Sequence, residues 1–326
     1  MKEHQLNLTI LILTLNEEKH IRRCINSAKR IADRVIVVDS FSTDATRTIA
    51  LELGAEVYQR KFISHAEQFN WGLDNLKIST EWVMKLDADE YLEDDLVAEL
   101  HNKLPELRPQ VSGILLRYKL IFMGRWIRFG GRNSLKLVRI WRFGFGRLEN
   151  RLMDEHVAIQ SGDIVEFKSH FCDHNLNNFS LFIDKHNGYS VREAVEYLIQ
   201  KYKLRQHRTS NQSLERSARI KRILKSEVYH RLPVLLAPFL YFFYRFFVLG
   251  GFLDGYQGVV YHSFQALWYR FLVAVRIVDW DRKIACLPPT ARLAQLEELS
   301  GLHLVLHDGG EGLSSGGNAT TNNQCG

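Results

Sequence analysis

The sequence contains few cysteines, and none of them forms a closely spaced pair. The four cysteines, Cys24, Cys172, Cys286 and Cys325, never fall within a C-x-x-C spacing. A zinc ribbon needs such pairs and a disulfide-stapled scaffold needs many more cysteines, so these two classes of protein are excluded. We therefore expect a protein of a reducing compartment, namely the cytoplasm.

Two glycine-rich phosphate-binding motifs are also missing. No G-x-G-x-x-G follows the first apolar stretch, and G-x-x-x-x-G-K-[ST] occurs nowhere in the 326 residues. The backbone amides of such loops cradle phosphates in dinucleotide-binding and P-loop proteins, so both classes lose their fingerprint. A nucleotide site in this chain has to use other groups, such as carboxylates with a metal ion.

Acidic residues are scarce in one strongly basic segment. The formal net charge is +6, yet residues 201–231 hold ten bases and two acids, so this segment alone carries +8. Such a local block points to an anionic surface, either membrane lipid or nucleic acid. Aromatic residues do not alternate with these bases as a stacking platform would require, so we expect lipid and no nucleic acid.

Long hydrophobic runs are limited to two. Residues 8–15 lack the preceding bases and the cleavage site of a signal peptide, and we interpret them as a buried strand. Residues 234–253 are long enough to cross a bilayer, but they contain Pro238, Arg245 and two adjacent glycines. We expect an interfacial helix or hairpin here rather than a membrane span, with a buried core helix as the alternative.

Short β-rich apolar stretches alternate with helical ones over the first hundred residues. We expect strands at 6–13, 34–38, 55–58 and 82–86, with helices at 17–31, 43–53 and 64–76. This alternation predicts a parallel sheet covered by helices. Ligands of such sheets bind beyond the carboxyl ends of the strands, so the chemistry is expected there.

The remaining chain is less regular and then helical. A strand is expected at 113–118, followed by helices at 179–202, 214–231, 234–253, 258–277 and 291–299. The tail from residue 307 has no Lys or Arg and is rich in Gly, Ser, Thr and Asn, which predicts disorder.

Carboxylates follow two of the predicted strands. Asp39 can accept hydrogen bonds from a nucleobase or a ribose, or it organises a capped turn and nothing more. Asp87 and Asp89 follow the strand at 82–86, where two neighbouring carboxylates repel each other unless they share a cation. Oxygen ligands favour Mg²⁺ or Mn²⁺, and an acidic helix start is the alternative for this acidic run.

Two further polar clusters lie downstream. Residues 154–156, Asp-Glu-His, offer a base for taking a proton from an alcohol, or they form an exposed acidic loop. His170, Cys172 and His174 would share one face of a strand and could bind zinc. No fourth ligand occurs at a suitable spacing, so we favour a structural polar cluster.

Three motifs resemble those of the family 2 glycosyltransferases of the GT-A fold. In order and spacing they are Thr14-Leu-Asn-Glu-Glu18, Val37-Val-Asp-Ser-Phe-Ser-Thr-Asp44 and Leu86-Asp-Ala-Asp-Glu90. Residues 152–156, 184–194 and 251–255 are similar to a bacterial subgroup that builds lipopolysaccharide core, capsule and exopolysaccharide. The expected fold is therefore α/β, with a GT-A-type, mostly parallel sheet flanked by helices, followed by a helical, membrane-associating C-terminal region.

The resemblance implies an inverting transfer from a nucleoside-diphosphate sugar, usually UDP-linked, to an acceptor hydroxyl. The nucleotide-sugar-binding residues would be Thr14, Asn16, Glu17, Asp39, Gln68, Asn70, Asp87 and Ala88. Asp89, with Asp87, would hold Mg²⁺ or Mn²⁺. Glu155 is favoured as the catalytic base, with Asp154 second. Four bases either close over the diphosphate or are surface charges: Arg128, Arg132, Lys136 and Arg139.

We therefore predict a metal-dependent transferase that extends a lipid-linked glycan, held peripherally by anionic lipid at the inner face of the plasma membrane. One alternative transfers the sugar to polyprenyl phosphate, and another is a non-catalytic nucleotide-sugar-binding membrane scaffold. Four regions follow from this hypothesis. Residues 1–105 bind the nucleotide sugar, 106–180 bind the acceptor, 181–285 associate with the membrane, and 286–326 form a short helix and the tail.

Overall fold

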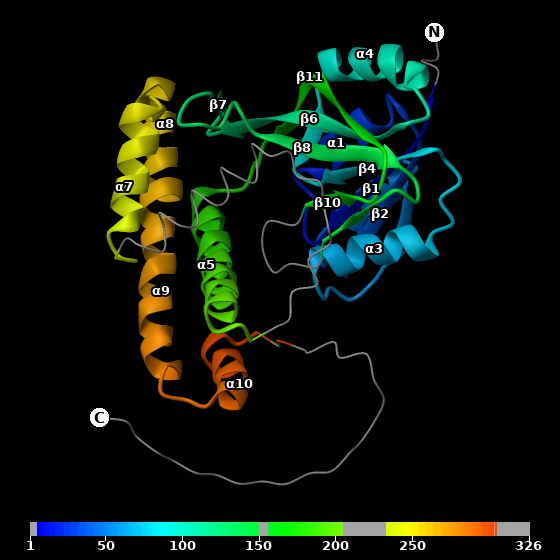
Figure 1. Ribbon diagram of the computed structural model, residues 1–326. Helices are drawn as coiled ribbons and strands as arrows, with labels where there is room; N and C mark the ends of the chain where they lie inside the picture. The colour runs from blue at the N-terminus through cyan, green and yellow to red at the C-terminus, as the bar shows by residue number, and fades with distance from the viewer. Residues whose placement is uncertain (1–4, 150–155, 205–232, 303, 305–326) are drawn as a thin grey trace, which may run out of the picture.

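The computed structural model describes residues 5–149, 156–204, 233–302 and 304, and consists of a sheet-based unit beside a helical one (Figure 1). The first elements alternate as expected: β1 (Leu6–Thr14), α1 (Ile21–Ala28), β2 (Ala32–Asp39), α2 (Thr46–Glu52), β3 (Glu56–Gln59), α3 (His65–Asn75) and β4 (Trp82–Asp87). The strands pair in parallel in the order β3-β2-β1-β4. The four predicted strands and three predicted helices of this region are confirmed, with shorter helices.

The next strands complete the same sheet, except β9 and β10, which pair with each other in a separate two-stranded sheet. The elements are β5 (Glu90–Leu92), α4 (Asp94–Lys103), the short η1 (Leu104–Glu106), β6 (Val111–Phe122), β7 (Arg125–Trp126), β8 (Lys136–Arg142), β9 (Gly146–Leu148), β10 (Val157–Ile159) and β11 (Asp163–Asp173). The order along the sheet is β3-β2-β1-β4-β8-β6-β11-β5. The predicted α/β fold is confirmed. The sheet is mixed, because β8 runs antiparallel between β4 and β6.

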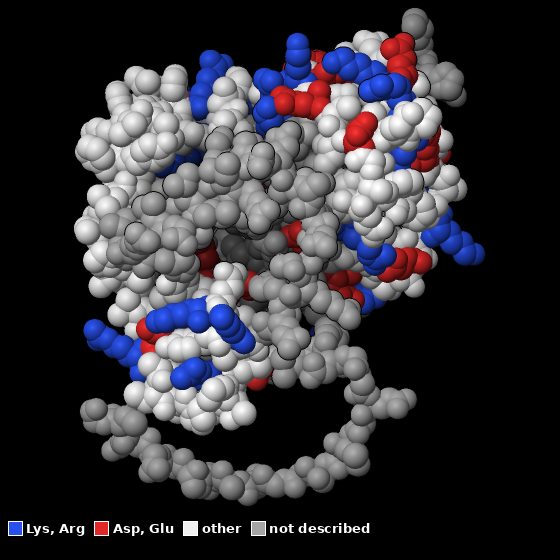
Figure 2. Space-filling model, in the orientation of Figure 1, with Lys and Arg blue, Asp and Glu red and all other residues white. Residues whose placement is uncertain are grey.

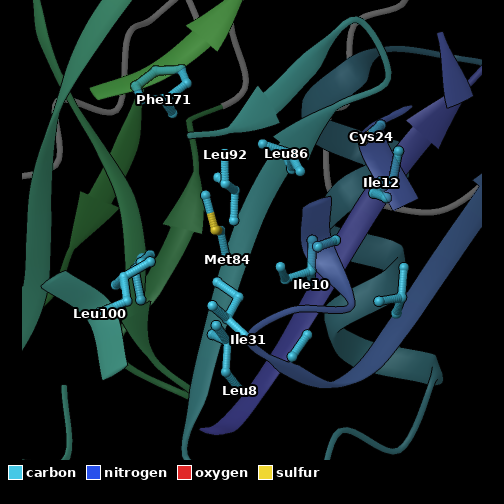
Figure 3. Close-up of a cluster of buried hydrophobic side chains, with 14 of the residues drawn as sticks. Leu8, Ile10, Ile12, Cys24, Ile31, Met84, Leu86, Leu92, Leu100 and Phe171 are labelled. Atoms are coloured by element: carbon cyan, nitrogen blue, oxygen red, sulfur yellow. The ribbon is translucent and has the colours of Figure 1, made fainter. Parts of the chain in front are cut away.

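Alternation of side chains along β1 explains why the sheet is covered on both faces. Leu8, Ile10 and Ile12 belong to one buried cluster, which also contains Met84 of β4 and residues of α1 and α4. Figure 3 shows these side chains gathered along β1 and β4. Leu11, between them, packs on the opposite face against α3. Successive strand residues point to opposite faces, so β1 is apolar at nearly every position.

The C-terminal unit is helical and has a core of its own. It contains α5 (Phe179–Tyr202), α7 (Ala237–Phe243), η2 (Tyr244–Val248), η3 (Gly251–Asp254), α8 (Gly255–His262), η4 (Ser263–Trp268), α9 (Tyr269–Ile284) and α10 (Pro289–Ser300). The predicted helix at 179–202 is confirmed, and Asn178 caps it by accepting a hydrogen bond from the Leu181 amide. Side chains of α5, α9 and α10 form the third buried cluster of the protein.

Residues 234–253 do not form one continuous helix. The run is divided into α7, the π-helical η2 and the 3-10 turn η3, with Gly250 in a left-handed conformation between the last two. Among the described residues, no helix has both the length and the apolar character needed to span a bilayer. Most side chains of residues 234–253 are exposed or only partly buried, which does not fit a buried core helix.

Candidate active site

The predicted site residues meet because three parallel strands end together. Thr14 at the end of β1 is paired with Asp39 at the end of β2, and Leu13 is paired with Asp87 at the end of β4. The two aspartates therefore lie on either side of the end of β1. This is the carboxyl edge of the sheet, where ligands of such folds bind.

Asp39 is fully buried and saturated with hydrogen bonds. Its Oδ1 accepts from the hydroxyls of Thr14 (3.1 Å) and Ser42, and its Oδ2 accepts from the Ser42 amide (3.0 Å) and the Gln59 amide group (3.3 Å). Of the two roles considered for Asp39, the structure therefore displays the organiser of a turn. A nucleotide can reach this carboxylate only by displacing a partner, and Gln59 makes the longest of the four contacts.

Loops after β1 and β2 are tied to each other around this carboxylate. The amide of Asn16 donates to the Ser42 hydroxyl (2.9 Å), and its side-chain oxygen accepts from the Thr43 amide (2.8 Å). The amide of Glu17 donates to the Thr46 hydroxyl at the start of α2 (2.7 Å). Thus Thr14 and Asn16 are joined to Asp39, Asn16 through Ser42, while Glu17 is bonded separately to the start of α2.

The two predicted residues of α3 differ in their surroundings. Gln68 is fully buried and donates to the hydroxyl of Ser40 (2.9 Å), so it belongs to the Asp39 turn. Asn70 lies elsewhere: its side chain exchanges two hydrogen bonds with the backbone of Leu148 in β9 (2.9 and 3.0 Å). Asn70 therefore fastens β9 to α3, and the structure does not bring it to the carboxylates.

Asp87 lies between two cations. Its Oδ1 accepts from Lys85 Nζ (2.6 Å) and its Oδ2 from Arg139 (3.4 Å), while its backbone amide donates to Glu90 (2.8 Å). Burial alone would raise the pKa of Asp87, but the charges of Lys85 and Arg139 outweigh it and hold this pKa well below its usual range. The two cations therefore favour the ionised form of this carboxylate.

Asp89, two residues after Asp87, is partly exposed and is held by residues that follow β11 and by one residue of α1. Asn175 donates to its Oδ2 (3.0 Å), and the amide of His174 and the guanidinium of Arg23 both donate to its backbone carbonyl (3.1 Å each). Ala88, between the two aspartates, is buried. The turn is thus fixed by α1 and by the residues that follow β11, and Asp89 remains partly exposed.

Helix α5 adds a cation that sequence reasoning did not assign. The pKa of Lys185 would be lowered by burial, but the carboxylate of Asp89 and, more weakly, those of Glu17 and Asp173 raise it. Burial and the charge of Asp89 in turn raise the pKa of Asp173 to about 7. Lys185 lies in the segment 184–194, which resembles the bacterial subgroup. The sequence therefore marked this segment, but it did not assign a function to Lys185.

The four bases that were expected to close over the diphosphate separate into different surroundings. Arg139 is buried between Asp87 and Glu90. Lys136 pairs with Glu166 on β11, and Arg128 lies over the ring of Trp126. Arg132 lies over the ring of Tyr261 in α8 and is shielded among tyrosines. Of these four bases, Arg139 is the one bonded to Asp87, and it lies inside the protein.

The predicted bases and the predicted metal-binding clusters remain to be located in the structure. Asp154 and Glu155, the predicted bases, lie outside the described residues. Within the described ranges, no group of three or more His, Cys, Asp or Glu side chains is arranged to hold a metal ion. In the His170–His174 segment, Cys172 is buried and His174 contacts Arg23 (3.0 Å), in agreement with a structural polar cluster.

The residues that form this edge lie in a part of the chain that matches a known protein family. Residues 9–168, which include Asp39, Asp87 and Asp89, match the family described as Glycosyl transferase family 2. The chain contains a glycosyl transferase family 2 domain. This domain covers β1 to β11 almost completely, and the helical unit lies beyond it.

Two bacterial glycosyltransferases are similar to part of this chain. An uncharacterized glycosyltransferase of Rickettsia typhi is 37% identical over 118 residues, which are 34% of this chain and 39% of that protein. The lipopolysaccharide core biosynthesis glycosyltransferase LpsC of Rhizobium meliloti is 32% identical over 108 residues, 32% of this chain and 37% of that protein. The aligned regions thus span about two fifths of the relatives' lengths.

Among solved structures, the mannosyltransferase PcManGT from Pyrobaculum calidifontis, in complex with GDP-Man and Mn²⁺, is similar over 91% of this chain and 81% of that one. The identity is 14% and the TM-score 0.41.

Proposed function

We propose that this protein is a metal-dependent, inverting glycosyltransferase that moves a sugar from a nucleoside-diphosphate sugar, UDP-linked, to a hydroxyl of a lipid-linked glycan. The observation that carries the proposal is the meeting of Asp39, Asp87 and Asp89 at the carboxyl edge of a family 2 domain. The product belongs to lipopolysaccharide or another cell-surface polysaccharide, a proposal supported by the similarity to LpsC.

The residues present fit a hard divalent cation. Asp87 is ionised, Asp89 is partly exposed, and both offer oxygen, the donor that Mg²⁺ and Mn²⁺ prefer. Asp89, with Asp87, would hold the ion, and the other ligands would come from diphosphate and water. When bound, the ion stabilises the negative charge of the departing diphosphate.

The other steps belong to the chain's own residues. Thr14, Asn16 and Gln68 fix the turn that receives the nucleoside, and Asp39 holds that turn from beneath. Glu155, or else Asp154, takes the proton of the acceptor hydroxyl as that oxygen attacks the sugar. One in-line displacement inverts the anomeric centre, so no enzyme nucleophile takes part.

Thermal unfolding tests the donor site directly. We expect UDP with Mn²⁺ to raise the unfolding temperature, because a ligand that binds only the folded state stabilises it by about 2.7 kcal/mol at a hundred times its Kd. GDP and CMP serve as comparisons, and EDTA should abolish the shift. If no nucleotide moves the transition of folded protein, the proposed transferase activity is overturned.

A further inference from the structure

One side of the helical unit exposes an unusually large apolar surface, here called the apolar face. Its members come from α7, η2, η3 and the start of α8, and each is between 45% and 69% exposed: Phe239, Leu240, Phe243, Tyr244, Phe247, Val248, Phe252, Leu253 and Tyr256. Phe243 and Phe247, one helical turn apart, have ring centroids 5.0 Å apart. Monomeric proteins rarely expose a contiguous patch of this kind unless it binds something.

The only charges within this run point into the protein. Arg245 is 7% exposed, and its Nε donates to the carbonyl of Gly130 (2.6 Å). Asp254, the single acidic residue between 233 and 278, is 2% exposed and accepts the amides of Arg128 (3.1 Å) and Phe129 (2.9 Å). Arg245, which argues against a membrane span in the sequence, is therefore no obstacle to interfacial contact in the structure.

These inward contacts also fasten the apolar face to the family 2 domain. The loop after β7 is bonded at Gly130, whose amide donates to the carbonyl of Leu249 (2.9 Å). The ring of His262 fills the space beside Gly130 and Gly251, where any Cβ would lie within 2.1 and 2.5 Å of its atoms. The face thus has a fixed orientation relative to the carboxyl edge, which a loosely tethered anchor would not have.

The surroundings of the apolar face favour an anionic partner. Arg125 lies beside Gly255 at the edge of the face, and Arg128 is also exposed there. The residues that precede Pro233 in the sequence, 201–231, carry a net charge of +8. Figure 2 shows the part of the molecule over α7 and α8 as almost free of acidic side chains.

We propose that the apolar face inserts into the interfacial layer of an anionic phospholipid bilayer and so fixes how the carboxyl edge faces the membrane. Exposed phenylalanines with tyrosine hydroxyls at their border suit the boundary between acyl chains and headgroups. The broken helix lies on the membrane rather than across it, in agreement with the lack of a spanning helix among the described residues. This inference deepens the proposed function, because it supplies the surface on which a lipid-linked acceptor is met.

Vesicle flotation with the full chain tests the docking surface. The wild type is expected to float with vesicles of phosphatidylcholine and phosphatidylglycerol in equal amounts, and less with phosphatidylcholine alone. The Phe243→Ser/Phe247→Ser variant is expected to partition at least about tenfold less, because each buried aromatic ring contributes roughly that factor. The matched control is Leu51→Ser/Ile164→Ser, which removes two apolar side chains that are also half exposed but lie on the sheet unit.

Three results overturn the inference. In the first, both double variants float like the wild type. In the second, the wild type does not float with either kind of vesicle. In the third, the wild type binds no vesicles but forms a dimer in ultracentrifugation, and Phe243→Ser/Phe247→Ser dissociates that dimer. Nucleotide-dependent thermal shifts, measured on the same samples, keep this test apart from the proposed function. They are expected to be equal in all three proteins, because the substituted residues lie away from the carboxyl edge.

A second inference rests on a different observation, the backbone at Phe41. This residue has φ +62°, in the left-handed region that favours glycine, and its side chain is 55% exposed. Its neighbours are fixed, since the Ser40 amide donates to the Thr14 carbonyl (2.9 Å) and Ser42 holds Asp39. Leu15, at the end of the adjoining strand, is 51% exposed. Strain of this kind at a bulky residue persists mainly at ligand sites.

We infer that the phenyl ring of Phe41 is a stacking surface for the nucleobase of the donor, an inference that rests on the proposed function. Phe41→Gly and Phe41→Asn relieve the strain, so both are expected to unfold at a higher temperature. Both are expected to bind UDP with Mn²⁺ about tenfold more weakly, since stacking on an aromatic ring is worth that factor or more. Phe41→Tyr keeps the ring and is expected to bind like the wild type.

Pyrophosphate with Mn²⁺, which has no base, provides the control and should bind all four proteins equally. Equal UDP affinity in Phe41→Gly, Phe41→Asn and the wild type overturns the stacking role. Failure of the wild type to bind any nucleotide is a separate result, because it removes the proposed function itself.

Discussion

Replacing Arg139 by methionine is expected to destabilise the protein by about 3–5 kcal/mol, the usual effect of removing one partner from a buried ion pair. Arg139 is 6% exposed, lies 4.7 Å from the ring centroid of Phe171, and donates to Glu90 (2.5 Å) and Asp87 (3.4 Å). Methionine fills most of the volume but leaves the buried Glu90 without its cation, while Asp87 keeps only Lys85. Urea denaturation measures the change in the free energy of unfolding.

The pH dependence of this loss identifies its cause. Burial raises the pKa of Glu90, so its ionised form is the one that the folded state disfavours. Without Arg139, stability is retained at low pH, where Glu90 is protonated, and is lost as the pH rises. The variant should therefore lose more at pH 8 than at pH 5.

Arg147→Met is the matched control. It breaks a pair with Asp74 in which both side chains are about half exposed, and such pairs contribute about 1 kcal/mol or less. Adding Glu90→Gln to Arg139→Met should recover part of the loss. A loss in Arg139→Met no larger than in Arg147→Met would show that the buried charges are not what the arginine stabilises.

The parallel half of the sheet could be predicted from the sequence, because each of its strands is marked by residues that are neighbours in the chain. Strands β1, β2 and β4 are largely apolar stretches, and each strand from β1 to β4 ends at or beside a polar residue that marks the edge. The positions of Asp39 and Asp87 on either side of β1 follow from the pairing of neighbouring strands. The membership of Gln68 in this group needed the family resemblance, since nothing local distinguishes it from Asn70.

The rest depends on contacts between residues far apart in the chain. Strand β8 enters the sheet between β4 and β6, which brings Arg139 to Asp87, yet its sequence mixes charged and apolar residues. The charge of Asp89 acts on Lys185, which lies far along the chain, and the residues after β11 that lead to α5 are bonded to the Asp89 turn. Periodicity predicts a helix at 179–202 but cannot say which sheet edge that helix faces.

Asp89→Asn is expected to abolish the Mn²⁺-dependent thermal shift with UDP and to lower turnover by about a thousandfold, while leaving the fold intact. Asparagine keeps the oxygen that accepts from Asn175, so the structural contact survives and only the charge is lost. An ionised oxygen ligand is the group that a hard cation requires, and its loss removes the charge stabilisation of the leaving diphosphate. Calorimetric titration with UDP and Mn²⁺ separates binding from turnover.

Asp94→Asn provides the comparison within the same acidic run. The Asp94 side chain is 92% exposed at the start of α4, where it pairs with Arg30 and favours the helix N-terminus. Its replacement should leave nucleotide binding unchanged and reduce stability only slightly. If Asp94→Asn and Asp89→Asn weaken UDP binding equally, the acidic run acts through its overall charge, and no single carboxylate at the end of β4 holds the metal.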